Sequence, residues 1–442
     1  MESYPYKNYK IVDADQLNAD LTSVADAIRI KGKTTASLDF PDGFVGAIDN
    51  IKTGDDAPVA EKDVNFYDYD GTLLHAYTVA DAQALTELPE LPEREGLICQ
   101  GWNWTLEDIK AHHRAVDVGA TYTTDDGTTR LYIHLEEGRT SPMLGVCPNG
   151  TVTVDWGDGT EPDTLTGAST STVQWTPNHE YAAPGDYVIK LTVDGEMGIR
   201  GYSGGSYILN GKVGTKDIST VYRSQIKRVE IGSGVTSFGD YAFYYCYSLN
   251  SIVIPNSVTN IGNNTFYNCY PLDFVVIPNS VTNIGNNTFY NCYALFSVSI
   301  SNSVKEIGSY TFQYCYSLNS IVIPNSVTYI GQWSFKNCSA LRSVVIPNSV
   351  TTIYSESFAS CSAMAFVVIS NSIKSIPSAL FQYSSGVRYF DFTNNTAVPT
   401  LPNINAFNNI VEDCEIRVPA ALYDEWIAAT NWATYADKIV AV

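Results

Sequence analysis

Residues 201–205 read GYSGG and formally fit G-x-S-x-G, the pattern of a serine nucleophile on a sharp turn. Such a serine needs a helix directly after it and a histidine further along the chain as its base. The residues that follow the motif, 206–209, read SYIL, which is typical of a strand. All five histidines precede the motif, namely His75, His112, His113, His134 and His179. Ser203 therefore lacks the partners that nucleophilic catalysis requires.

A second catalytic candidate is the stretch VNFYDYDGTLL, residues 64–74. It resembles the nucleophile motif of the haloacid dehalogenase superfamily, which implies that Asp68 attacks a phosphoryl group and Asp70 protonates the leaving oxygen. Such a phosphatase also needs a parallel sheet and further magnesium-site residues, and we expect no second parallel strand between Leu74 and Gly119. We favour a β-hairpin across Asp70-Gly71. A phosphatase that uses Asp68 is the distant alternative.

The possible metal ligands are also weak. Asp155, Asp158 and Asp163 could suggest a calcium loop, but their spacing lacks the alternating ligand pattern of an EF-hand. His112 and His113 are adjacent, so on a helix they point to different faces. We predict a protein that is not an enzyme and that holds no metal or other cofactor.

Composition bounds the class of protein. The 442 residues suggest several domains, and 45% hydrophobic content with 12% aromatic residues is typical of globular protein. A formal charge of −21 disfavours binding to nucleic acid or anionic lipid. No apolar run is long enough to cross a bilayer, and the N-terminus shows no export signal, so we expect a soluble product without membrane insertion.

The charge is uneven along the chain. Residues 220–395 carry eight basic side chains (Arg223, Lys227, Arg228, Lys305, Lys336, Arg342, Lys374, Arg388) and six acidic ones (Glu230, Asp240, Asp273, Glu306, Glu356, Asp391). This part is nearly neutral, and the acidity lies upstream.

The same part of the chain repeats every 23 residues. The repeat is carried by Cys246, Cys269, Cys292, Cys315, Cys338 and Cys361, with Ser384 in register, and by Phe243, Phe266, Phe289, Phe312, Phe335, Phe358 and Phe381. Within one unit we expect an apolar interior formed by Leu249, Ile252, Ile254, Val258, Ile261, Phe266 and Cys269. One unit cannot enclose this set, so neighbouring units must stack into a solenoid. The cysteines then form a buried ladder of thiols and not a disulfide network.

Residues 226–395 resemble leucine-rich repeats of the BspA-like type, whose unit reads approximately I-G-x-x-A-F-x-x-C-x-x-L-x-x-I-x-I-P-x-S-V. Ser301 and Ser370 replace the proline, and Tyr354 and Pro377 replace the glycine, which we interpret as local adjustments. The segment that follows resembles the terminal cap of such arrays. It predicts a strand, a helix over residues 420–430 and a final strand.

Upstream, residues 150–193 resemble a PKD domain, an immunoglobulin-like β-sandwich. The motif is carried by Asp155, Trp156, Gly157, Asp158, Gly159, Thr160, His179, Tyr181, Gly185 and Tyr187. We expect the sandwich to begin near Gly119, with TYTTDDGTTRLYIHL as a hairpin, and to serve as a spacer.

The start of the chain carries Leu17, Leu21, Val24 and Ile28 at helical spacing. With the Asp-Gly hairpin and the stretch EGLICQGWNWTLEDIK, it resembles the front end of prophage tail-associated proteins of gut bacteria. The predicted fold is mainly β and multidomain. The predicted segments are a helical attachment module (1–52), a linker with hairpin and short helices (53–117), a PKD-like sandwich (118–199), a leucine-rich repeat solenoid (200–396) and a cap (397–442).

Aromatic residues recur at positions of the repeat that the interior does not use. The candidate ligand-binding residues are Tyr244, Tyr247, Tyr267, Tyr270, Tyr290, Tyr293, Tyr310, Tyr314, Tyr316 and Trp333. Tyrosine offers a rigid apolar face and a hydroxyl, which suits protein epitopes and sugar rings. Ring-on-ring pairing that serves stability alone is an equally open interpretation.

We therefore predict a phage or prophage tail-associated receptor-binding protein that adheres to the host cell surface and resides in the virion. Its expected partners are a bacterial surface glycan or protein and, through the N-terminal module, other tail proteins, with homo-oligomerisation possible. The alternative is a bacterial cell-surface adhesin of the BspA-like type.

Overall fold

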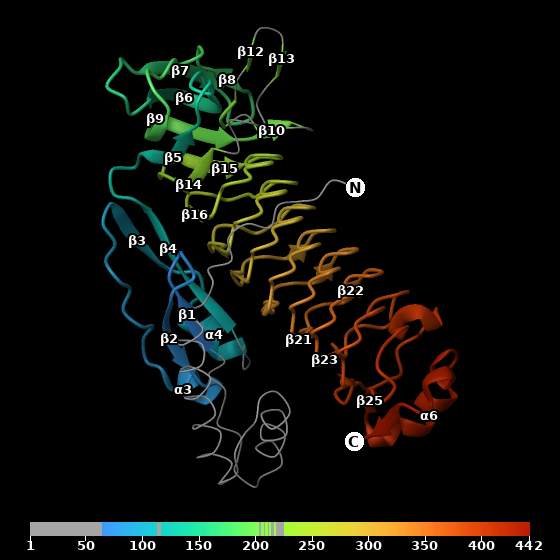
Figure 1. Cartoon of the computed structure of the whole chain (residues 1–442). Coiled ribbons are helices and arrows are strands. Elements are labelled where there is room, and N and C mark those ends of the chain that lie inside the picture. The colour runs from blue at the N-terminus through green and yellow to red at the C-terminus, as the bar shows by residue number, and fades with distance from the viewer. Residues whose placement is uncertain are drawn as a thin grey trace, which may run out of the picture. The chain divides into compact units, whose positions relative to one another are not determined.

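The structure is a computed structural model that describes residues 64–112, 116–202, 205–206, 208–210, 212–213, 216–217 and 225–442. The predicted attachment module and Ser203 lie outside these ranges. The chain divides into two units, Met1–Glu61 and Lys62–Val442, and every element below belongs to the second unit. This unit is mainly β (Figure 1).

A small mixed sheet begins the described chain, and we call residues 64–124 the four-stranded module. Its elements are β1 (Val64–Tyr67), β2 (Leu73–Tyr77), α3 (Val79–Ala84), β3 (Leu97–Trp102), α4 (Leu106–His112) and β4 (Val116–Thr124). Strands β1 and β2 pair antiparallel around the turn, which confirms the predicted hairpin. The expectation that no second parallel strand follows was wrong, because β4 returns beside β1 in parallel after the two short helices.

Strands β4 and β5 (Thr129–Leu135) flank the second Asp-Gly turn, but the hairpin predicted there was wrong. Strand β4 pairs with β1 and β3, whereas β5 pairs with β9 (Gly185–Ile199) and β14 (Ile226–Glu230). The reason is that the strands serve different cores. Val116, Val118 and Ala120 pack inside the four-stranded module, and Leu131 and Ile133 pack in the core shared with the repeats.

A larger sheet joins residues 129–199 to the repeats. Its order is β16-β14-β5-β9-β6-β7, where β6 is Gly145–Asp155, β7 is Asp163–Ala168 and β16 is Ser251–Val253. Strand β8 (Gln174–Trp175) pairs with β6, and β15 (Val235–Phe238) pairs with β9. Two small hairpins follow β9, formed by β10 (Gly201–Tyr202) with β11 (Gly205–Ser206) and by β12 (Lys212–Val213) with β13 (Lys216–Asp217). The sheet thus runs without a break into the first repeats, and the domain boundaries stay a prediction.

The repeats stack as a solenoid, whose coils follow one another from β14 to β25 in Figure 1. One side carries β17 (Phe274–Val276), β18 (Ser297–Ser299), β21 (Ser343–Val345), β23 (Phe366–Val368) and β24 (Tyr389–Asp391), and we call it the strand face. Another carries β19 (Glu306–Ile307), β20 (Tyr329–Ile330) and β22 (Thr352–Ile353). The predicted interior residues of the unit are all buried, with at most 3% of each side chain exposed.

The end of the chain continues the parallel ladder with β25 (Glu415–Val418) and β26 (Ile439–Ala441). Between these strands lie η2 (Ala420–Leu422), α6 (Tyr423–Ala428) and η3 (Trp432–Tyr435), and η1 (Ile404–Phe407) precedes them. The predicted strand, helix and strand are therefore confirmed. Trp426 and Trp432 are fully buried against Phe392, so this segment covers the last coil with aromatic rings.

All nine cysteines are free, and the six of the repeat ladder are fully buried. The thiol of Cys292 donates a hydrogen bond of 3.2 Å to the carbonyl of Phe266, and Cys269, Cys315, Cys338 and Cys361 make the equivalent bond. Ser384 keeps it at 2.9 Å with its hydroxyl. The ladder therefore fills a narrow slot and also adds a hydrogen bond from each coil to a phenylalanine carbonyl of the coil before it.

The four-stranded module packs on the strand face of the early repeats. The buried amide of Asn103 donates to the carbonyls of Ile277 (2.9 Å) and Ser299 (3.1 Å), and the indole of Trp104 donates to Ile300 (2.8 Å). Gly119 allows close approach, since a Cβ there would lie 2.6 Å from a methyl carbon of Val276. The chain thus covers part of its own strand face.

Candidate functional site: an aromatic surface on the repeats

Each repeat turns through a tight loop between its Gly and its Cys, and two residues of this loop adopt a left-handed backbone. In the second and third coils these positions are Asn264, Asn268, Asn287 and Asn291, with φ of 56° to 62°. Asparagine tolerates this conformation better than other residues with a Cβ. The loop therefore brings the residues after it, including the one that follows each Cys, to the surface at a constant spacing.

The first aromatic column follows the cysteines. Tyr247, Tyr270, Tyr293 and Tyr316 stack in succession, with ring centroids 5.0, 4.8 and 5.3 Å apart and interplanar angles of 27° or less. Tyr293 and Tyr316 are exposed, with 38% and 45% of their surface accessible, and the other two are partly exposed. The four predicted residues thus form one continuous outer column.

A second column runs beside it. Tyr244, Tyr267 and Tyr290 stack with centroids 5.0 and 4.5 Å apart. Tyr245 joins the two columns at one end through Tyr244 and Tyr247. Tyr314 joins them at the other, 5.5 Å from Tyr290 and 5.9 Å from Tyr316. We call Tyr244, Tyr245, Tyr247, Tyr267, Tyr270, Tyr290, Tyr293, Tyr314 and Tyr316 together the tyrosine surface.

The remaining two predicted residues, Tyr310 and Trp333, contact each other and not the rings of the two columns. Tyr310 and Trp333 pack edge to face, 4.7 Å apart, and the ammonium of Lys336 lies 5.4 Å from the Trp333 ring. Tyr310 lies on the same loop as Tyr314, and Trp333 lies at the equivalent position of the next coil.

The tyrosine surface is electrically neutral. In the sequence between Tyr241 and Trp333 the charged residues are Asp273 and the opposite charges Lys305 and Glu306. Asp273 lies beside the strand face, directly before β17. Burial raises the pKa of the Tyr290 and Tyr316 phenols above the ordinary value of 10. The hydroxyls therefore stay protonated at physiological pH and can donate hydrogen bonds.

The left-handed positions hold a signal that sequence reasoning missed. Tyr241, Tyr245, Tyr310, Tyr314, Trp333 and Tyr383 all have φ between 59° and 64°, where neighbouring repeats place asparagine. A bulky residue is disfavoured there by about 1 kcal/mol. The register of the repeats contains this information, because the asparagines at equivalent positions mark the conformation. These aromatic residues therefore occupy positions whose left-handed backbone conformation disfavours them.

The second catalytic candidate, Asp68 with Asp70, is engaged in a structural network. Asp68 is fully buried, accepts hydrogen bonds from the guanidinium of Arg94, with one of 2.7 Å, and accepts another from the amide of Tyr69. Asp70 accepts from the amide of Thr72 within the turn. Both carboxylates therefore bind protein donors and hold the hairpin in place.

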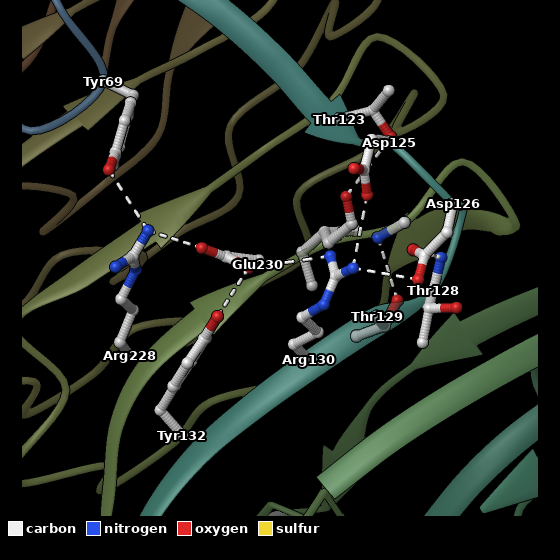
Figure 2. A network of polar contacts seen from close by, with 12 residues as sticks. Tyr69, Thr123, Asp125, Asp126, Thr128, Thr129, Arg130, Tyr132, Arg228 and Glu230 are labelled. Carbon is white, nitrogen blue, oxygen red and sulfur yellow. Dashed lines mark hydrogen bonds and ion pairs between the residues drawn. The ribbon is translucent and has the colours of Figure 1, made fainter. Parts of the chain in front are cut away.

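The network continues across three parts of the fold, as Figure 2 shows. The Tyr69 hydroxyl of the module accepts from Arg228 of β14 (3.2 Å), and Arg228 pairs with the buried Glu230. Glu230 also accepts from Tyr132 of β5 (2.9 Å) and lies 3.8 Å from Arg130. These contacts join the four-stranded module, the larger sheet and the first coil.

The PKD-like motif residues form a local cluster. Trp156 stacks on His179 with centroids 4.5 Å apart, and its indole donates to Asp163. Asp158 accepts from Thr160 and lies 2.8 Å from His179, and Asp155 accepts from the amide of Gly157. The described ranges contain no group of three or more His, Cys, Asp or Glu side chains placed to hold a metal.

Comparison with known proteins gives one family match. The family model described as "BspA type Leucine rich repeat region" matches residues 216–323 and 305–418, with six copies. No curated protein sequence matches the chain. None of the helices in the described ranges has the length and hydropathy that crossing a bilayer requires.

Several solved structures are similar to the chain. The leucine-rich repeat protein TpLRR of T. pallidum is 24% identical, with 46% of this chain and 88% of that one aligned and a TM-score of 0.34. A leucine-rich cell surface protein of Faecalibacterium prausnitzii is 21% identical over 52% and 84%, with a TM-score of 0.27. The pneumococcal vaccine antigen PcpA is 14% identical over 47% and 64%, with a TM-score of 0.29.

The 23-residue period, the buried Phe and Cys columns and the family match agree on one assignment. Residues 216–418 of this chain match the BspA-type leucine-rich repeat model, and the described residues among them form a repeat solenoid.

Proposed function

We propose that the protein is a non-enzymatic adhesion protein whose tyrosine surface binds a neutral glycan at a bacterial surface. One observation carries this proposal. The outer column of Tyr247, Tyr270, Tyr293 and Tyr316 ends where Ser339, Ser362 and Ser385 take the same repeat position. The solenoid continues unchanged through those coils, so the tyrosines are not needed to stack it.

The chemistry of the surface supports a glycan. Stacked phenol rings offer flat apolar faces for sugar rings, and their hydroxyls can exchange hydrogen bonds with sugar hydroxyls. The neighbouring side chains are mostly Asn and Ser, and the near absence of charge removes any electrostatic attraction for an ionic ligand. The ligand therefore carries little charge.

The coverage of the strand face also favours the tyrosine surface as the binding side. Over the coils that contain β17 and β18, it is covered by the four-stranded module through Asn103, Trp104 and Gly119. The tyrosine surface lies on the loops of those coils and stays accessible. In these coils the loops are thus the side available for a partner.

Two biological locations are considered for this adhesion protein, the bacterial cell surface and a phage tail. The BspA-type repeat match supports the cell-surface adhesin, because that prediction rests on this repeat family. The phage-tail setting, with receptor binding from a virion, rests on residues 1–52 and on motifs that the family match does not include. We therefore place the adhesin first and keep the tail protein second, with the PKD-like region as a spacer in either case.

Binding of the full chain to bacterial cell walls would test the proposal. The variant Tyr270→Ser with Tyr293→Ser inserts the residue that later coils use at this position. We expect cell-wall binding to weaken at least ~10-fold, since two adjacent stacking rings are lost. The matched control is Ser362→Ala with Ser385→Ala, at the same repeat position, and it should bind as the wild type does.

Equal binding by the tyrosine variant and the wild type would reject the proposal. Treatment of the walls separates the ligand classes: periodate oxidation should abolish binding to a glycan, and protease digestion should leave it intact. Binding that protease removes would assign a protein ligand instead.

A further inference from the structure

The four-stranded module and the strand face enclose a cavity of about 180 Å³. Asn65 and Tyr67 of β1 and Asp117 of β4 line it on one side, and Ser320, Val322 and Ser343 of the repeats on the other. An apolar cavity of about 150 Å³ is known to admit a benzene molecule. This cavity is thus large enough for a side chain or one sugar ring, and it is separate from the tyrosine surface.

The strand ladder is interrupted at the cavity. Strands β17 and β18 form one parallel sheet, and β21, β23, β24, β25 and β26 form another. Residues 320–323 lie between the two sheets and belong to neither. The coil is otherwise regular, because Leu318 and Ile321 are buried as in the other coils. The opening of the ladder therefore lies where the cavity is, opposite Asn65, Tyr67 and Asp117 of the module.

Asp117 is the acidic residue among the described residues that line the cavity. Its side chain is 5% exposed, and its two carboxylate oxygens accept only long hydrogen bonds, from Asn65 (3.2 Å) and Ser297 (3.4 Å). Among the described residues, none that lines the cavity is basic and none forms an ion pair with Asp117. Burial raises the pKa of this carboxyl. A buried carboxylate without a counter-charge is costly, and a cationic ligand would offset that cost.

The other lining groups restrict the cation. The Tyr67 ring is half-buried and packs 5.4 Å from Phe274, so it presents a fixed aromatic surface beside the carboxylate. Asn65 and Ser297 each occupy one position on a carboxylate oxygen, and one position stays open on each oxygen for an ammonium donor. Asn65, Ser320 and Ser343 add neutral hydrogen-bonding groups.

We propose that this cavity binds a primary ammonium group, which Asp117 pairs with and Tyr67 covers. The ammonium could belong to a lysine side chain or to an amino sugar. Both sources present the same charged group on a small neutral body.

Titration calorimetry on the full chain would test the site with four probes. These are Nα-acetyl-lysine methylamide, its Nε-acetylated form, glucosamine and N-acetylglucosamine. We expect saturable binding of an amine probe and at least ~10-fold weaker binding of its acetylated partner, because acetylation removes the charge. The amine probe that binds more tightly identifies the source.

Asp117→Asn should weaken binding of that probe at least ~10-fold and should not lower the melting temperature, since it removes an unpaired buried charge. Ser320→Trp is the second variant. It places a large ring at an exposed position of the cavity lining, so it should also abolish binding. Tyr270→Ser with Tyr293→Ser, which lies outside the cavity, should bind the probe as the wild type does.

The proposal is overturned if neither amine probe saturates the protein at about 10 mM, a level that detects even millimolar affinity. It is also overturned if amine and acetylated probes bind alike, or if both cavity variants bind as the wild type does. None of these outcomes depends on binding to cell walls, so the two proposals can fail separately.

Discussion

The repeats carry two aromatic columns of opposite character, one inside the solenoid and one on its surface. The inner column of phenylalanines runs through seven coils, with centroids 4.9 to 5.8 Å apart and every ring fully buried. The outer column after the cysteines has similar spacing but spans four coils, and serine replaces it in the next three. Similar stacking geometry thus serves the fold in one column and is dispensable to it in the other.

This difference separates stability from recognition. A ring in the inner column cannot be omitted from any coil, because a cavity would open in the shared core. A ring in the outer column is omitted in three coils that keep the same backbone. The following predictions test this comparison by the size of their effects on the free energy of unfolding.

The largest effect is expected in the inner column. Phe289→Ala should lower the free energy of unfolding by about 3 to 5 kcal/mol, because it removes a fully buried ring that stacks on Phe266 and Phe312. Chemical denaturation would measure this loss. A loss below about 1 kcal/mol would show that the inner column is no more structural than the outer one.

The thiol ladder makes stability depend on alkaline pH. Burial raises the pKa of Cys361 to about 12 from 9.0, so its contribution is complete below pH 9 and is lost as the pH rises toward 12. The loss should be about 1.4 kcal/mol per pH unit for each such thiol. Cys361→Ser should show a smaller alkaline decline, since a hydroxyl can keep the bond to Phe335 as Ser384 does to Phe358. Identical declines in both proteins would contradict this account.

A smaller effect is expected in the outer column. Tyr316→Ser should lower the free energy of unfolding by about 1 kcal/mol or less, because the ring is 45% exposed and contacts the partly exposed rings of Tyr293 and Tyr314. Its matched partner is Phe289→Ala in the inner column. Comparable losses for the two variants would favour the view that tyrosine pairing serves stability alone.

The smallest effect should have the opposite sign. Tyr383 has a φ of 62° and is 54% exposed, so Tyr383→Asn should raise the free energy of unfolding by about 0.5 kcal/mol as the backbone strain is relieved. Asn337→Ala, at the equivalent loop position, is the reverse control and should destabilise the protein. A destabilised Tyr383→Asn variant would mean that the aromatic ring contributes to packing there.

The sequence by itself determined the solenoid and the composition of both columns. Cys292 and Tyr293 belong to a 23-residue register in which each residue contacts the equivalent residues of the neighbouring coils. The period alone therefore predicts which residues stack on each other. The register also separated buried Phe289 from partly exposed Tyr290. For the candidate site, this was enough to predict the tyrosine surface, although Tyr310 and Trp333 form their own pair.

Only the tertiary structure decided what lies across the repeats. The parallel pairing of β4 with β1, the contact of Asn103 with Ile277 and Ser299, and the cavity beside Asp117 join residues that are far apart in sequence and follow no period. Such contacts depend on the shape of two finished surfaces, which no local pattern encodes. The repeat could be derived from the sequence because it is local and recurs, whereas the docking of the module on it occurs once.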